Sequence, residues 1–210
     1  MNATILRTCA ATMLVTAFAL AAFHQVTAGF SAVTADGVRR AALAQAPRAL
    51  PDIALVDQHG DALALSDFAA PAAPATFIAL VYVQCQTVCR TGASGQAWLQ
   101  HAIRVRGLQG RVRLLTLSFD PRNDNPAVLD GHARKLGADA ALWKFATVRD
   151  VADLPGMLKL FDIVVLPDGL GGYSHNAALF LVDRNGRLAR AYDIDRPDLA
   201  LADFLRQAGG

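Results

Sequence analysis

The sequence has 210 residues, 53% of them hydrophobic, with 20 Lys and Arg residues against 18 acidic ones and a net charge of +2. This length suits one globular domain plus a leader and leaves little room for two full domains. Charges of both signs are interspersed without a basic stripe, so no nucleic acid partner is expected. All the acidic residues are Asp, so no Glu can act as a base or a ligand.

Residues 1–28 form an apolar leader. Arg7 is its lone charged residue, and the apolar core at 9–23 has the length of a signal-peptide core. Val26, Thr27 and Ala28 offer a small-residue cleavage site, but an uncleaved membrane anchor fits equally well. We expect an exported protein, either free in the periplasm or anchored in the inner membrane by this segment. Cys9 precedes the core and is interpreted as an ordinary apolar residue.

Residues 29–49 are Ala-rich with scattered charges, which predicts a partly helical tether. The folded domain is expected at 50–210. It opens with β-rich runs at 53–56 and 62–65 on either side of a polar, Gly-containing turn, and this pattern predicts an N-terminal β-hairpin. His59 lies in that turn and needs no function there.

A strongly apolar run at 76–83 predicts a buried central strand, and the polar stretch after it predicts a helix over 87–105. The core face of this helix is expected to carry Trp98, Leu99, Ala102 and Ile103, with His101 off that face. Cys85 and Cys89 lie at the junction between strand and helix.

The remaining pattern alternates strands and helices. Strands are predicted at 112–119 and 142–147, helices at 127–136, 151–160 and 197–207, and a short extended piece at 163–166. His132 is expected on the surface of the second helix, and a Gly-rich loop delivers His175. The Asn-Gly pair between the runs 178–182 and 188–192 predicts a late hairpin. This order of elements favours an α/β fold, a central mixed sheet with helices on both faces.

The cysteine pair suits a metal ion at least as well as a disulfide. Unpaired amides and the dipole of a helix N-terminus push a thiol there toward thiolate. Helical residues at this spacing have Cβ atoms roughly 5–6 Å apart, whereas a relaxed disulfide needs about 3.5–4.5 Å. Two metal–sulfur bonds of about 2.3 Å span sulfurs up to ~4.6 Å apart. A structural disulfide is the other option in an oxidising compartment, but a loop this short restricts the unfolded chain little.

Four segments of the chain together resemble the Sco/SenC family of exported, thioredoxin-like proteins that assist copper-site assembly in cytochrome oxidase. They are LPDIALVDQHGDALALSDF, VYVQCQTVC, LSFDPRNDNPAVL and YSHNAALFLVDRNGRLA, and the resemblance spans residues 50–208. It implies a thioredoxin-like three-layer sandwich. It also implies that Cys85, Cys89 and His175 are copper ligands. The implied partner is the copper-bearing subunit of cytochrome c oxidase or another copper carrier.

The chemistry of these three residues agrees with the resemblance, because thiolates select Cu(I) and imidazole suits copper in either oxidation state. Asp120 resembles an acidic residue that the family has near the site. It could orient a ligand, or it could be a turn or cap residue, which Asp before Pro commonly is. Both interpretations stay open.

The sequence departs from the family pattern at three positions. Gln86 and Arg90 stand where the family usually has proline after each cysteine, and Asn176 stands where Ser commonly follows the histidine. Losing the prolines loosens the backbone around the pair. The cation of Arg90 should favour thiolate, which could tune the site toward redox work.

Two enzyme activities remain as alternatives. In a thiol–disulfide oxidoreductase, Cys85, expected to be the more exposed thiol, would attack a target disulfide and Cys89 would resolve it, with a thioredoxin-like reductant as partner. In a peroxidase, Cys85 would pass through a sulfenate. His175 distinguishes these hypotheses from copper binding, since dithiol exchange does not need it.

Overall fold

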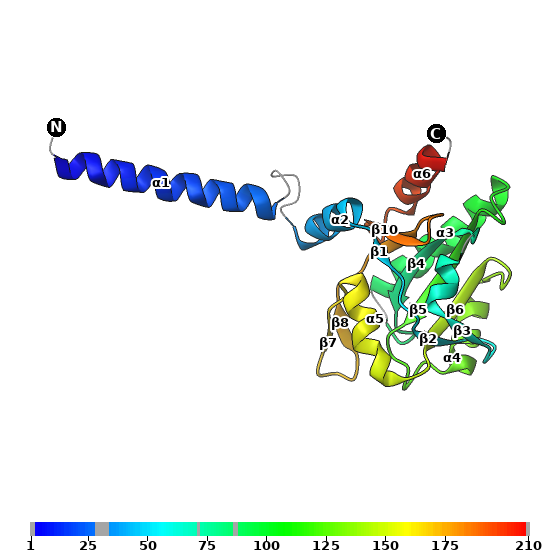
Figure 1. Ribbon diagram of the computed structural model, residues 1–210. Helices are drawn as coiled ribbons and strands as arrows, with labels where there is room; N and C mark the ends of the chain where they lie inside the picture. The colour runs from blue at the N-terminus through cyan, green and yellow to red at the C-terminus, as the bar shows by residue number, and fades with distance from the viewer. Residues whose placement is uncertain (1–2, 28–33, 71, 86–87, 209–210) are drawn as a thin grey trace. The chain divides into compact units, whose positions relative to one another are not determined.

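The chain divides into two units, Met1–Gln45 and Ala46–Gly210, and an eight-stranded sheet organises the second one (Figure 1). The computed structural model describes residues 3–27, 34–70, 72–85 and 88–208, with the backbone alone at 88–90 and 208. The departure at Gln86 therefore lies outside the described residues, and the side chains of Cys89 and Arg90 are not described.

The first unit holds two helices, α1 (Ala3–Val26) and α2 (Ala35–Gln45). Every residue of α1 is exposed, and within the described ranges it is the one helix long and apolar enough to cross a membrane. A signal sequence meets the same criteria of length and composition, so the helix fits both a cleaved leader and a membrane anchor. The α2 helix occupies part of the predicted tether. Its first turn is stabilised by the hydroxyl of Thr34, which accepts a hydrogen bond from the Gly37 N–H at 3.0 Å.

The sheet of the second unit is mixed, with the strand order β1-β10-β9-β4-β5-β6-β2-β3. The strands β4, β5 and β6 run parallel, while β9 and β2 flank them antiparallel. All of β4 is buried, as expected for a central strand covered on both faces. The mixed sheet and the N-terminal hairpin of β2 and β3 are confirmed. The bounds are β1 (Arg48–Ala49), β2 (Ala54–Asp57), β3 (Ala62–Ala64), β4 (Ala75–Val81), β5 (Val112–Ser118), β6 (Trp143–Val148), β9 (Leu179–Val182) and β10 (Arg187–Tyr192).

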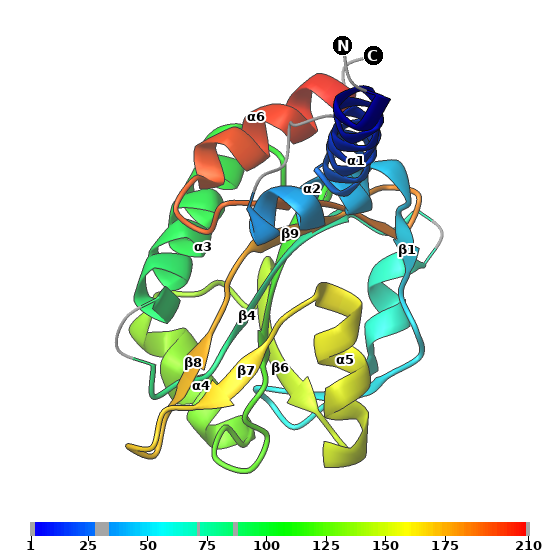
Figure 2. The same ribbon diagram turned by 90° about the vertical axis from the view of Figure 1, so that its left-hand side faces the viewer.

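Helices cover both faces of this sheet. Figure 2 shows α3, α4 and α6 on one side and α5 on the other. On the first side Leu99 and Ile103 of α3 and Phe204 of α6 join one buried cluster. On the second side the ring of Phe161 in α5 lies 4.9 Å from that of Phe180. The predicted three-layer, thioredoxin-like architecture is confirmed. The bounds are η1 (Leu65–Ala69), α3 (Val88–Val105), α4 (Pro126–Lys135), η2 (Val151–Asp153), α5 (Leu154–Phe161) and α6 (Pro197–Ala208).

A second, two-stranded sheet carries the histidine singled out by the sequence. It consists of β7 (Val165–Pro167) and β8 (Tyr173–His175), with Val165 opposite His175. The turn between them is held by the Asp168 carboxylate, which accepts hydrogen bonds from the N–H groups of Leu170 and Gly172 at 2.7 and 2.9 Å. The sequence analysis anticipated an extended piece and a Gly-rich loop here, but not this hairpin.

Two further expectations differ from the structure. Arg48 and Ala49, assigned to the tether, form β1 and pair with β10. Trp98 is 40% exposed and is not part of the core face of α3. Its neighbour Leu99 is fully buried, and one helical step of about 100° turns Trp98 away from the sheet.

Candidate metal centre

Cys85 lies where the chain leaves β4 and turns toward α3. Its backbone N–H donates a hydrogen bond to the Tyr82 carbonyl at 3.1 Å, which closes a turn at the end of the strand. Cys85 is only 8% exposed. The side chain of Cys89 is not described, so the expectation that Cys85 is the more exposed thiol of the two stays a prediction. The turn draws the Cys85 thiol under the protein surface, where a target disulfide reaches it poorly.

Cys89 lies in the first turn of α3, since that helix begins at Val88. The N–H groups of a first turn have no partner within the helix, and the helix dipole is positive there. The backbone therefore provides the setting that favours a thiolate.

A buried carboxyl group, that of Asp124, supports the segment between β4 and Cys85. Its Oδ2 accepts hydrogen bonds from the Val83 N–H at 2.9 Å and from the Ser118 hydroxyl at 2.5 Å. Asp124 is 1% exposed, and burial raises the pKa of its carboxyl. Asp124 was not predicted from the sequence. Its position four residues after Asp120, in the same turn, was the available signal.

Asp120 lies beside this support and is buried as well. Its carboxylate accepts a hydrogen bond from the Asn123 side chain at 2.8 Å, and its N–H donates to the Ser118 hydroxyl at 3.0 Å. These contacts organise the turn after β5. Of the two carboxyl groups in this turn, that of Asp124 is hydrogen-bonded to the segment that leads into Cys85.

Four aromatic rings join the cysteine junction to the β7–β8 hairpin, and we call them the aromatic cluster: Tyr82, Phe119, Tyr173 and His175. The Tyr82 hydroxyl accepts a hydrogen bond from the Tyr173 N–H at 3.2 Å, and Tyr82 and Tyr173 have ring centroids 5.2 Å apart. The His175 ring lies 4.9 Å from that of Phe119 and 6.1 Å from that of Tyr82. The Tyr173 ring thus packs within the cluster, and the cluster brings His175 beside the residues that precede Cys85.

The protonation of His175 follows from its surroundings. Nδ1 lies 2.9 Å from the backbone carbonyl of Asn176. A carbonyl oxygen can only accept, so Nδ1 carries the proton and Nε2 keeps its lone pair. Burial lowers the pKa of the ring, opposed by this hydrogen bond. A neutral imidazole is the form that binds a metal ion.

Cys85 also lines a cavity of about 250 Å³. His132 of α4 lines the same cavity, and the remaining lining residues are Tyr82, Val83, Ala93, Ser94 and Leu136. His132 is half-buried with its ring 5.9 Å from that of Phe145, so the expectation of a surface residue is wrong. Burial lowers its pKa. By contrast, His59 and His101 are exposed, as expected.

Among the described side chains, no three of His, Cys and Asp lie close enough together to hold a metal ion. The Cys89 side chain is not among them. A metal site at this junction would therefore draw on Cys89 together with Cys85.

A thioredoxin-like fold, a cysteine at each end of a strand-to-helix junction and a neutral imidazole on a neighbouring hairpin define a class of proteins suited to thiol chemistry or to soft metal ions. Within that class the family is shown by a family model. The SCO1/SenC model matches residues 41–208, and the chain belongs to this family.

A curated relative, the SCO1 protein homolog of Bacillus subtilis (strain 168), is 25% identical over 115 residues. The match covers 54% of this chain and 58% of the relative, so this chain spans little more than half the length of that protein.

Solved structures with the same fold include a SCO1/SenC family lipoprotein from Bacillus anthracis str. Ames, with a TM-score of 0.68 at 23% identity over 78% of this chain and 98% of that one. ScoI of Bradyrhizobium japonicum with copper bound has a TM-score of 0.60 at 23% identity, covering 75% and 98%. BsSco, described as having a disulfide switch and as a member of the Sco family of cytochrome c oxidase assembly proteins, has a TM-score of 0.65 at 19% identity, covering 77% and 94%.

Proposed function

We propose that this protein is a copper metallochaperone. The thiolates of Cys85 and Cys89 hold Cu(I) as cargo, and the imidazole of His175 completes a site of two sulfurs and one nitrogen for Cu(II). The observation that carries this proposal is the hydrogen bond between Tyr82 and Tyr173, because it fastens the histidine hairpin to the segment that leads into Cys85.

The donor set suits copper and does not suit a hard cation. Thiolate is a soft ligand that prefers Cu(I), and imidazole suits both oxidation states. Carboxylates would favour hard ions, and the carboxylate of Asp124 is engaged with Val83 and Ser118. The copper bound to the related ScoI of Bradyrhizobium japonicum supports the same cargo here.

Three ligands leave the ion open to an incoming donor, which is what a carrier needs. A thiolate of the recipient can bind the copper before a thiolate of this chain leaves, so the ion is never released into water. The recipient we propose is the copper-bearing subunit of cytochrome c oxidase or another copper carrier, in keeping with the assembly role described for BsSco.

The N-terminal helix supports a compartment outside the cytoplasm. α1 is apolar along its length and would either direct export or anchor the protein. We propose that the domain works in the periplasm, where an oxidase subunit at the membrane surface is accessible to it.

A thiol–disulfide oxidoreductase is the second candidate, with a thioredoxin-like reductant as its partner. The position of Cys89 in the first turn of α3 favours it, because a helix N-terminus stabilises a thiolate. The burial of Cys85 counts against it, because attack on a target disulfide needs an accessible thiol. Copper carriage therefore ranks first.

Adding Cu(II) to the reduced full-length protein tests the proposal. We expect a visible absorption band from sulfur-to-copper charge transfer, and its loss in Cys85→Ser and in Cys89→Ser. His175→Ala should weaken Cu(II) by more than the roughly 10- to 100-fold that loss of an outer hydrogen-bonding partner costs. It should change Cu(I) affinity far less.

His101→Ala is the matched control, because that side chain is exposed on the same helix as Cys89. No band in the unsubstituted protein, together with full reduction of a test disulfide, would reverse the ranking of the two candidates. Equal Cu(II) affinity in His175→Ala would remove the histidine from the ligand set.

A further inference from the structure

The hairpin that carries His175 needs an anchor outside itself. The strands β7 and β8 have three residues each and form a sheet separate from the main one. Isolated two-stranded hairpins are marginally stable in water. The hairpin also buries little, since Leu166 is 59% exposed and Leu170 is 92% exposed. Tyr82 holds it at Tyr173, near the turn. At the open end the His175 ring packs against Phe119, and a hydrogen-bonded attachment there would hold the backbone of the two strands as well.

Asn176 provides that attachment. Its Oδ1 accepts a hydrogen bond from the Val164 N–H at 2.7 Å, and its Nδ2 donates to the Asp162 carbonyl at 3.0 Å. Its own backbone carbonyl is the group that contacts Nδ1 of His175. The Asn176 side chain thus ties the residue after β8 to the segment that enters β7. The paired residues that it secures, Val165 and His175, are the sequence neighbours of Val164 and Asn176.

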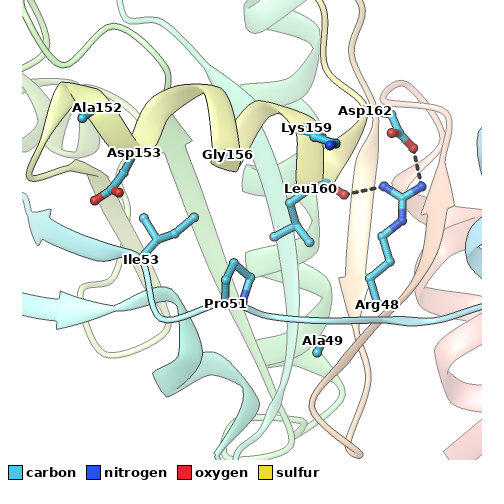
Figure 3. Close-up of a pocket in the computed structure, with 10 residues that line it drawn as sticks. All are labelled: Arg48, Ala49, Pro51, Ile53, Ala152, Asp153, Gly156, Lys159, Leu160 and Asp162. Atoms are coloured by element: carbon cyan, nitrogen blue, oxygen red, sulfur yellow. Dashed lines mark hydrogen bonds and ion pairs between the residues drawn. The ribbon is translucent and has the colours of Figure 1, made fainter.

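The partner of Asn176 is itself held in place. Asp162 ends α5 in the left-handed conformation, with φ 52° and ψ 41°. A residue other than glycine adopts this conformation only at some cost, so it persists where the surroundings fix it. Asp162 Oδ2 forms an ion pair with Arg48 at 2.6 Å, and the Leu160 carbonyl accepts a second hydrogen bond from the same guanidinium at 2.6 Å (Figure 3).

Arg48 connects this end of α5 to the main sheet. It belongs to β1 and lies opposite Leu188 of β10. The connected residues Arg48, Asp162 and Asn176, which we call the clamp, therefore lead from the eight-stranded sheet to the histidine hairpin. Each link is a hydrogen bond of 3.0 Å or less.

We propose that Asn176, held through Asp162 by Arg48, is the positioning residue that sets the place and ring direction of His175. This inference rests on the proposed copper site, because it assigns the clamp to the ligand that Cu(II) needs and Cu(I) does not. Without the clamp, the open end of the hairpin moves away from α5, and the backbone of residue 176 can turn its carbonyl away from Nδ1, so the tautomer of His175 is no longer fixed. The two thiolates are unaffected, so Cu(I) stays bound.

The test compares the unsubstituted full chain in detergent with Asn176→Ala, Asn176→Asp and Arg48→Ala. Copper-free protein is measured first, by hydrogen exchange of the Val164 amide and by the nitrogen chemical shifts of the His175 ring. Asn176→Ala should speed exchange at Val164 about 5- to 10-fold, since it removes one hydrogen bond. Asn176→Asp keeps an acceptor for that amide, so its exchange should stay within about twofold of the unsubstituted protein.

Copper binding is measured second. Asn176→Ala should raise the Cu(II) dissociation constant about tenfold, within the range for losing a group that orients a ligand. Cu(I) affinity should change less than about twofold because imidazole is not needed for it. Arg48→Ala should act in the same direction and more weakly. Asn185→Ala, in the exposed turn after β9, and Arg196→Ala, in the exposed ion pair with Asp198, are the controls and should change none of these quantities.

Asn176→Ala protein with unchanged Val164 exchange and an unchanged ratio of Cu(II) to Cu(I) affinity would overturn the inference. Equal weakening of both oxidation states would also overturn it, because that result indicates general loosening of the fold. If the unsubstituted protein binds no copper, the proposed function fails. The positioning role is then decided by Val164 exchange and by the ratio of the two neutral tautomers of His175: both change in Asn176→Ala if it is right, and neither does if it is wrong.

Discussion

The hydroxyl of Tyr82 accepts a hydrogen bond from the backbone N–H of Tyr173 at 3.2 Å, and this contact joins the strand before Cys85 to the hairpin that carries His175. The two residues are 91 positions apart in the sequence. Their rings meet edge to face, with centroids 5.2 Å apart. The contact fastens the histidine hairpin to the segment that leads into Cys85, so its strength should appear in copper binding.

Tyr82→Phe should lower the free energy of unfolding by about 1–2 kcal/mol, the net value of the two hydrogen bonds that the hydroxyl makes with the N–H and the carbonyl of Tyr173. It should also weaken Cu(II) severalfold, because the turn end of the histidine hairpin is less well held. Denaturant unfolding and Cu(II) titration measure the two effects. Tyr192→Phe is the control: it removes the hydroxyl that donates to Asp203 at 2.6 Å, remote from the site, so it should cost stability and leave Cu(II) affinity unchanged.

Asp124→Asn should flatten the dependence of stability on pH. Burial raises the pKa of the Asp124 carboxyl in the folded protein above its ordinary value of 3.8. Below that value the carboxyl is protonated in both states. As the pH rises, the unfolded state ionises first, so the stability contributed by this group is lost as the pH passes through the raised folded pKa. Melting temperatures measured from low to neutral pH for both proteins give the comparison, and parallel curves would contradict this assignment.

In the copper-free protein, His175→Gln should make the free energy of unfolding fall less at acid pH. Burial lowers the pKa of His175 below 6.5, so protonation favours the unfolded state. The stability that the neutral ring contributes is fully present above pH 6.5 and is lost as the pH falls through the lowered pKa. The unsubstituted protein should therefore lose more in melting temperature than His175→Gln between about pH 7.5 and about pH 5. His101→Gln, at an exposed position, should keep the slope of the unsubstituted protein.

Gly186→Ala should destabilise the fold by about 2–5 kcal/mol, through left-handed strain and a steric clash. Gly186 has φ +70°, and a Cβ there would meet the carbonyl oxygen and Cα of Ala69. Gly107 has φ +63° with nothing within 4 Å of its Cβ position, so Gly107→Ala carries the strain alone, about 1–2 kcal/mol. Thermal unfolding measures both. An equal effect of the two substitutions would show that the approach to Ala69 costs nothing.

The strands of the main sheet could be predicted because each is marked locally. The apolar run of β4 and the Asn-Gly pair between β9 and β10 are visible without any knowledge of the rest of the chain. The helix of Cys89 was equally visible, and it begins one residue from the expected position. Trp98 was misplaced because an aromatic residue at the edge of a helical stripe can turn to either side.

The candidate site was less accessible to sequence reasoning, since its contacts join distant segments. The β7–β8 hairpin depends on the turn held by Asp168. The glycines of this turn predict a loop, so the two short strands on either side of it were not predicted. Tyr82 looked like one more apolar residue of a strand, and its hydroxyl acquires a role only when Tyr173 is opposite. Asp124 is buried and His132 is half-buried by tertiary packing that no local pattern records.

The central claim is that copper is held by the sulfurs of Cys85 and Cys89 and by the imidazole of His175. X-ray absorption at the copper edge, on the Cu(II)-loaded full-length protein and on His175→Ala, tests it most directly. We predict two sulfur neighbours and one imidazole nitrogen around copper in the unsubstituted protein, with the imidazole signal absent in His175→Ala. A copper ion without sulfur neighbours, or an imidazole signal that survives the substitution, would contradict the account.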